Sequence, residues 1–107
     1  VALPIDAIGR LAREHGAELF VDAIQSVGAR PIDVRAIGAH YVAAGAYKWL
    51  TGPPGAAFLW VDPAAAEALD PQLVGWLSHA EPDAFLRGDA AALRPHRPLT
   101  RGARVFE

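Results

Sequence analysis

The sequence has no cysteine, no methionine and a single lysine among its 107 residues. Without cysteine, disulfides and thiolate-bound metals are excluded, and the composition is compatible with a reducing cytoplasm, where we expect the protein. The 4 histidines lack the His-x-x-x-His spacing of a zinc-binding helix, so we expect no metal site. No apolar run approaches the roughly 18–20 residues that cross a bilayer, so we expect no membrane partner.

Neither sign of charge dominates the sequence. A formal net charge of −2 gives no electrostatic reason to expect nucleic acid as a partner. A hydrophobic content of 52% with 21% charged residues is typical of a globular protein. The length fits one small domain or a piece of a larger one. Because there is no initiator methionine and both ends fall beside expected elements, we expect an excised segment of a longer protein.

Helix signals occur in four places, with typical start or stop residues. The expected helices lie within residues 3–16, 31–38 and 62–69, with a short one near 83–87. Pro4 suits a first helical turn and Gly16 a helix end, while Asp33 is a typical cap for a helix that Gly38 closes. The apolar spacing in the first segment is that of an amphipathic helix.

Three apolar runs have the length of strands, at residues 17–21, 40–47 and 56–61. The helix between the first two predicts a parallel strand pair. The step to the third run is too short for a parallel crossover, which needs a dozen or more residues, so we expect an antiparallel strand there. Trp49 and Trp60 are expected to pack in the core. The sequence thus predicts an α/β fold with an incomplete sheet, followed by a loop-rich segment over residues 70–107.

The single lysine, Lys48, follows the second expected strand, and Asp22 follows the first. Ligands of open parallel sheets bind beyond the carboxyl ends of the strands, so both residues are expected at one crevice. Their spacing alone favours an ion pair or two unrelated surface charges. The alternative is an aromatic aldehyde cofactor, because an amine forms a Schiff base with an aldehyde and a guanidinium does not.

Three motifs occur in a fixed order around these two residues. They are Asp22-x-x-Gln25, the stretch GARPIDV over residues 28–34, and Lys48-Trp49 followed by GPPG at residues 52–55. Together they resemble the class V aminotransferase branch of the fold-type I pyridoxal-phosphate enzymes, which includes cysteine desulfurases, kynureninases and several aminotransferases. The resemblance implies an aspartate aminotransferase-like large domain, three-layered, with a mostly parallel sheet and one antiparallel strand. Residues 1–107 would be part of that cofactor-binding domain, and residues 70–107 would lead towards a C-terminal domain.

The resemblance also implies a role for each site residue. Lys48 would hold pyridoxal 5′-phosphate as a Schiff base and carry a proton at the Cα of an amino-acid substrate. Asp22 would pair with the pyridine nitrogen, and Gln25 would hydrogen-bond the phenolic oxygen of the ring. Tyr47 would contact the phosphate, as the tyrosine at this place does in kynureninases. The phosphate loop and the substrate-carboxylate arginine would lie outside this chain, and the full-length protein would be a homodimer.

The reaction within the family stays open. The stretch before the lysine, Gly45-Ala46-Tyr47, lacks the serine that many cysteine desulfurases carry there. Kynureninases, which share the tyrosine, usually have histidine in place of Gln25. We expect a class V aminotransferase-like enzyme, with a kynureninase-like hydrolase or a cysteine desulfurase as alternatives of the same fold. A non-catalytic α/β module is the alternative of another class.

Overall fold

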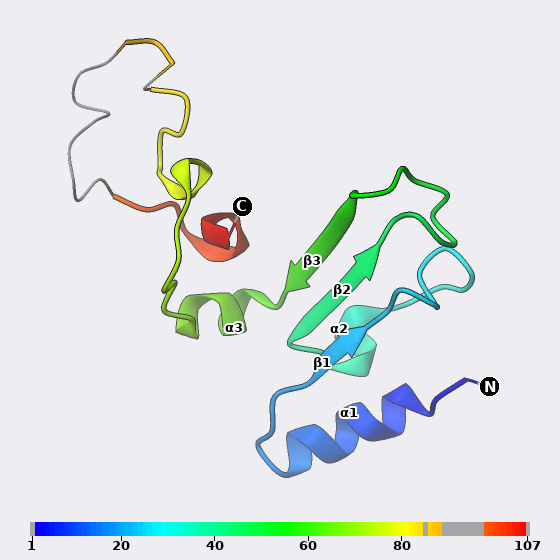
Figure 1. Cartoon of the computed structure of the whole chain (residues 1–107). Helices are drawn as coiled ribbons and strands as arrows, with labels where there is room; N and C mark the ends of the chain where they lie inside the picture. Colours follow the sequence, from blue (N-terminus) through cyan, green and yellow to red (C-terminus); the bar gives the residue numbers. More distant parts are fainter. Residues whose placement is uncertain (1, 85, 89–97, 107) are drawn as a thin grey trace. The chain divides into compact units, whose positions relative to one another are not determined.

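The computed structural model describes residues 2–84, 86–88 and 98–106 (Figure 1). They belong to two compact units, Val1–Asp62 and Pro63–Glu107. That residues 1–107 are part of one larger domain, with 70–107 leading on to another, stays a prediction.

The first unit is a small α/β layer whose elements follow the predicted order. They are α1 (Ile5–Glu14), β1 (Phe20–Asp22), α2 (Val34–Ile37), β2 (Tyr41–Gly45) and β3 (Ala57–Val61). The sheet order is β1-β2-β3, with β1 parallel and β3 antiparallel to β2. The predicted parallel pair and the predicted antiparallel third strand are both confirmed.

Local signals account for both helices of this unit. Pro4 directly precedes α1, and Gly16 lies beyond its end with a left-handed φ of 63°. In α2, one carboxylate oxygen of Asp33 accepts hydrogen bonds from the amides of Arg35 and Ala36, each at 3.0 Å. Gly38 ends the helix with a φ of 72°. Both predicted caps of α2 are therefore confirmed.

The core of this unit lies on one face of the sheet. Its buried residues are small, which allows close approach of helix to strand; they are Ala23, Ile37, Ala39, Val42 and Ala44. Ile5 of α1 and Val34 of α2 pack against this cluster, so both helices cover the same face. On the other face Phe20 is 59% exposed and Leu59 is 50% exposed. Within this unit the sheet therefore has a helical layer on one side.

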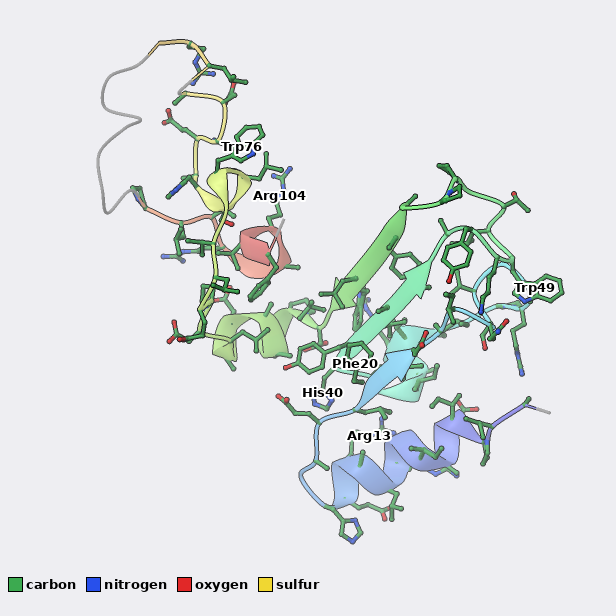
Figure 2. The ribbon with its side chains drawn as sticks, viewed as in Figure 1. Arg13, Phe20, His40, Trp49, Trp76 and Arg104 are labelled. Carbon is green, nitrogen blue, oxygen red and sulfur yellow. The ribbon has the colours of Figure 1, made fainter. Side chains whose placement is uncertain are left out.

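Two sequence predictions in this unit need correction. The first strand begins at Phe20 rather than at residue 17, because the backbone of Leu19 is already engaged by His40. The Leu19 amide donates to His40 Nδ1 at 3.1 Å, and the Leu19 carbonyl accepts from the His40 amide at 2.9 Å. Trp49 is not in the core but 58% exposed, on the loop after β2 (Figure 2). Trp60 packs against the core as predicted.

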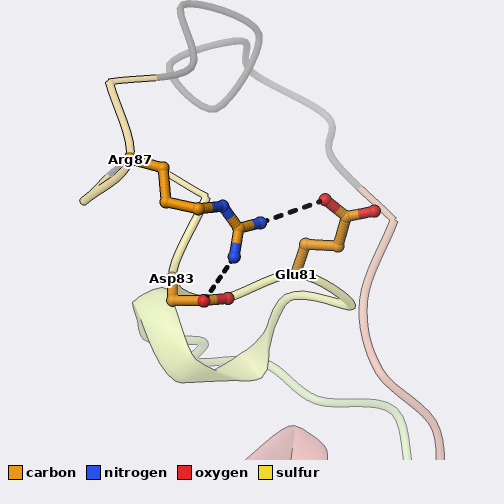
Figure 3. Close-up of polar contacts among 3 residues, drawn as sticks. All are labelled: Glu81, Asp83 and Arg87. Carbon is orange, nitrogen blue, oxygen red and sulfur yellow. Dashed lines mark hydrogen bonds and ion pairs between the residues drawn. The ribbon is translucent and has the colours of Figure 1, made fainter.

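The described part of the second unit consists mainly of short helices and loops. The helices are α3 (Pro63–Ala68), η1 (Trp76–Ser78) and η3 (Gly102–Phe106), and His79 forms an isolated antiparallel bridge with Leu99. The helix predicted near residues 83–87 is wrong for the described residues there, which form turns, while Phe85 lies outside the described residues. Arg87 bonds to Asp83 and lies 3.8 Å from Glu81 (Figure 3). These side chains are exposed, so the cluster contributes little to stability.

None of the helices in the described part of the chain is long and apolar enough to cross a bilayer.

Candidate functional site

Asp22 and Lys48 lie at the same edge of the sheet. Asp22 is the last residue of β1 and is in register with Ala43 of β2. Lys48 follows Gly45, the last residue of β2. Because β1 and β2 are parallel neighbours, their carboxyl ends meet at one edge, which is where ligands of such sheets bind. The predicted order, with each residue at or after the carboxyl end of one of two neighbouring parallel strands, is what the strand pairing shows.

Gln25 lies in the turn after β1, and this turn contacts the loop that carries Lys48. A Cβ placed on Gly28 would lie 2.6 Å from the carbonyl oxygen of Trp49. Only glycine allows that approach, and Gly28 also has a left-handed φ of 87°. The GARPIDV motif therefore has a local function: its glycine lets the turn of Gln25 pack against the backbone next to Lys48.

Two hydrogen bonds close the loop around Lys48. The Thr51 amide donates to the Lys48 carbonyl at 3.0 Å, and the Gly52 amide donates to the Ala46 carbonyl at 2.8 Å. Ala46 is held in turn by its own amide, which donates to the Ala56 carbonyl at 2.8 Å. The lysine therefore sits on a tight turn that extends the β2–β3 hairpin.

The polar ends of the predicted site residues are largely unengaged by the described part of the chain. Asp22 uses one carboxylate oxygen to accept from the Ile24 amide at 3.0 Å. Asp22 and Lys48 form no ion pair with each other; the ion pairs among the described residues are those of Arg87 with Glu81 and Asp83. Tyr47 is 54% exposed, with its ring beside Gly45. The ion-pair interpretation of Asp22 and Lys48 is therefore wrong, and an amine and a carboxylate remain available to a ligand.

One polar atom outside the predicted set is enclosed without a partner. Nδ1 of His79 is buried and has no hydrogen-bond partner among the residues that the structure describes. His79 also forms an isolated antiparallel bridge with Leu99, which lies far along the chain and which no local sequence pattern indicates. Among the described residues, no three His, Cys, Asp or Glu side chains gather into a set that could hold a metal ion.

Comparisons with known proteins agree with this arrangement. Residues 1–91 match the family described as aminotransferase class-V. An uncharacterized aminotransferase of Bacillus subtilis, YcbU, is 47% identical over 72 residues, which cover 67% of this chain and 20% of that protein. Kynureninase of Pseudomonas fluorescens is 38% identical over 77 residues, covering 71% of this chain and 18% of that enzyme.

The fold is also that of a solved enzyme. The apo structure of cysteine desulfurase from Thermococcus onnurineus superposes with a TM-score of 0.76 and 26% identity, covering 97% of this chain and 24% of that one. The predicted fold, a fragment of a pyridoxal-phosphate-dependent transferase, is confirmed. The chain spans about a fifth of the length of the curated relatives it matches. It belongs to the class-V aminotransferases, a family of pyridoxal-phosphate-dependent enzymes.

Proposed function

We propose that this chain carries the cofactor-binding lysine, Lys48, of a class V aminotransferase-like enzyme that acts at the Cα of an amino acid. The observation that carries the proposal is the placement of Asp22 and Lys48 at the ends of adjacent parallel strands with no ion pair between them. An amine and a carboxylate left available at a strand-end edge are groups that a ligand can use. Two unrelated surface charges would also lack an ion pair, and it is the three motifs around these residues, within the part of the chain that matches the family, that favour a cofactor.

The residues at this edge fit pyridoxal phosphate. Lys48 has the amine that the aldehyde of the cofactor requires. The carboxylate of Asp22 can hold the protonated pyridine nitrogen of the cofactor. The amide of Gln25 can donate to the ring oxygen, and the hydroxyl of Tyr47 to a phosphate oxygen. The cofactor, when bound, supplies an electron sink for negative charge at Cα. The amine of Lys48 would carry the proton to and from that carbon.

These four residues suit transamination, kynureninase-like hydrolysis and desulfuration alike. We therefore place aminotransferase activity first and treat the other two reactions as outcomes of the test. For the intact protein we also propose a homodimer, as the family resemblance implies, and a location in the cytoplasm, with which the cysteine-free sequence is compatible.

The test is exchange of the Cα hydrogen of amino acids with deuterated solvent, catalysed by the intact protein that carries this chain. We expect exchange for at least one common amino acid, and transfer of its amino group to a 2-oxo acid. Lys48→Ala should lower the exchange rate by roughly 10²–10⁴-fold, the usual contribution of a positioned proton carrier. Arg35→Ala, which changes an exposed residue of α2, is the matched control and should exchange like the wild type.

Each other outcome is informative. Release of alanine from kynurenine, or of sulfur from cysteine, without amino transfer would replace the aminotransferase reaction by one of its relatives. Absence of exchange with every amino acid, in a protein that folds, would contradict catalysis and favour the non-catalytic module.

A further inference from the structure

The loop that carries Lys48 contains a backbone conformation that its sequence disfavours. Thr51 has a φ of 53°, and no other non-glycine residue in the described ranges has a positive φ. A β-branched side chain in the left-handed region is an outlier that its surroundings must hold in place. We propose that Thr51 is a positioning residue that fixes Lys48 at the strand end, an inference that rests on the proposed function of Lys48.

Thr51 takes part in one of the two hydrogen bonds that close the loop, and its φ sets the other. Its own amide donates to the carbonyl of Lys48 at 3.0 Å, and the next amide, of Gly52, donates to Ala46 at 2.8 Å. Rotation about the N–Cα bond of Thr51 moves everything that follows it. Relaxing φ to a negative value would therefore carry the Gly52 amide away from Ala46 and open the turn around the lysine.

Contacts on both sides leave the loop little freedom once it is closed. A Cβ on Gly52 would lie 2.8 Å from the Cβ of Ala46, so the two segments touch. On the other side, the Trp49 carbonyl lies against Gly28 in the turn that carries Gln25. In the described structure no hydrogen bond or ion pair holds the amine of Lys48. The backbone therefore sets the point from which the side chain of Lys48 extends, and the turn at Thr51 sets that backbone.

The test compares Thr51→Pro with Thr51→Asn in the intact protein. Proline fixes φ at about −65° and removes the amide that bonds to Lys48. Asparagine keeps the amide and tolerates the left-handed region. The readouts are the rate at which cyanoborohydride traps pyridoxal phosphate on Lys48 across a range of pH, and the hydrogen exchange of the Gly52 amide.

We expect Thr51→Pro to slow trapping by about tenfold or more at every pH, since a small misplacement of a reacting group has effects of this order. The Gly52 amide should lose its protection in that variant. Thr51→Asn should retain the wild-type trapping rate and the protection. A shift of the pH profile without a lower plateau would instead indicate a changed basicity of the amine and would overturn the positioning role.

Two glycine variants keep the proposal testable if Thr51→Pro does not fold. Gly52→Ala opens the same closure from its other side and should also slow trapping. Gly55→Ala is the matched control in the same loop: Gly55 has a φ of 86°, so alanine is strained there, but a Cβ meets nothing within 4 Å. It should trap like the wild type.

The outcomes separate this inference from the proposed function. Trapping of the wild type on a residue other than Lys48 would overturn the proposed function itself. Normal trapping on Lys48 in the wild type and also in Thr51→Pro, or in Gly52→Ala, would overturn only the role of Thr51. Equal slowing by Gly55→Ala would overturn it as well, because general weakening of the loop would then explain the effect.

Discussion

Lys48 differs from the arginines of this chain in chemistry rather than in charge. A guanidinium stays protonated and cannot condense with an aldehyde, whereas an amine that loses its proton can. Lys48 is only partly buried, so a ligand can reach its amine. No side chain among the described residues forms an ion pair with that amine. At the scale of single residues, its distinguishing property is an amine that nothing else in this edge of the sheet engages.

The residue-scale prediction concerns Tyr41, whose hydroxyl donates to Glu18 Oε2 at 3.2 Å. Desolvation raises the pKa of Tyr41 above 10.0, and the hydrogen bond and negative charge of Glu18 raise it further. The raised pKa favours the neutral phenol in the folded state. Its contribution to stability is therefore fully present below the unfolded pKa and is lost as pH rises through the folded pKa.

Glu18→Gln should lower the pKa of Tyr41 towards its ordinary value, because the charge is removed while the desolvation remains. The measurement is an absorbance titration of tyrosinate in the 107-residue chain with Tyr47→Phe, which leaves Tyr41 as the only tyrosine. Glu14→Gln, on α1, is the control and should leave the titration unchanged. An unaltered pKa in Glu18→Gln would show that the carboxylate does not act on Tyr41.

At the scale of elements, the contact between α1 and α2 depends on one glycine and one arginine. Gly9 is buried, and a Cβ on it would lie 1.9 Å from the carbonyl oxygen of Ile37. The same oxygen accepts from Arg13 Nη1 at 2.9 Å. Carbonyls in the last turn of a helix have no partner within that helix. Arg13 therefore donates a hydrogen bond to a carbonyl that has no donor within the short helix α2.

Gly9→Ala should destabilise the fold although alanine is the better helix former. The gain in helix propensity is about 1 kcal/mol. Overpacking against a backbone carbonyl costs about 1–3 kcal/mol, and a weakened hydrogen bond from a charged donor costs about 1.5–3 kcal/mol more. The midpoint of urea unfolding should fall, while Arg10→Ala, at an exposed position of the same helix, should stay within about 0.5 kcal/mol of the wild type. A Gly9→Ala protein as stable as the wild type would contradict the contact.

The elements that the sequence predicted well are those with local signals. The helix α1 follows from apolar spacing, and α2 from the cap Asp33 and the stop Gly38. The start of β1 could not be predicted, because it depends on His40, a residue in the loop between α2 and β2. Nor could the exposure of Trp49, since an apolar residue next to a strand usually packs inside. In the site, the parallel-strand rule brought Asp22 and Lys48 to one edge, whereas the left-handed Thr51 carried no sequence signal.

At the scale of the whole molecule, the chain is about a fifth of the length of its curated relatives. It contributes a parallel strand pair, the turn of Gln25 and the loop of Lys48. The apolar face with Phe20 and Leu59 is exposed in the first unit. Because the chain covers only about a fifth of these relatives, activity has to be measured on the intact protein.

The central claim is that Lys48 holds pyridoxal phosphate, and borohydride reduction of the intact protein with added cofactor tests it most directly. Peptide mapping by mass spectrometry then locates the reduced adduct. We predict a stoichiometric adduct on Lys48 that is absent in Lys48→Arg, which keeps the charge and loses the amine. An adduct on another residue that persists in Lys48→Arg, or no adduct in a folded wild-type protein, would contradict the claim.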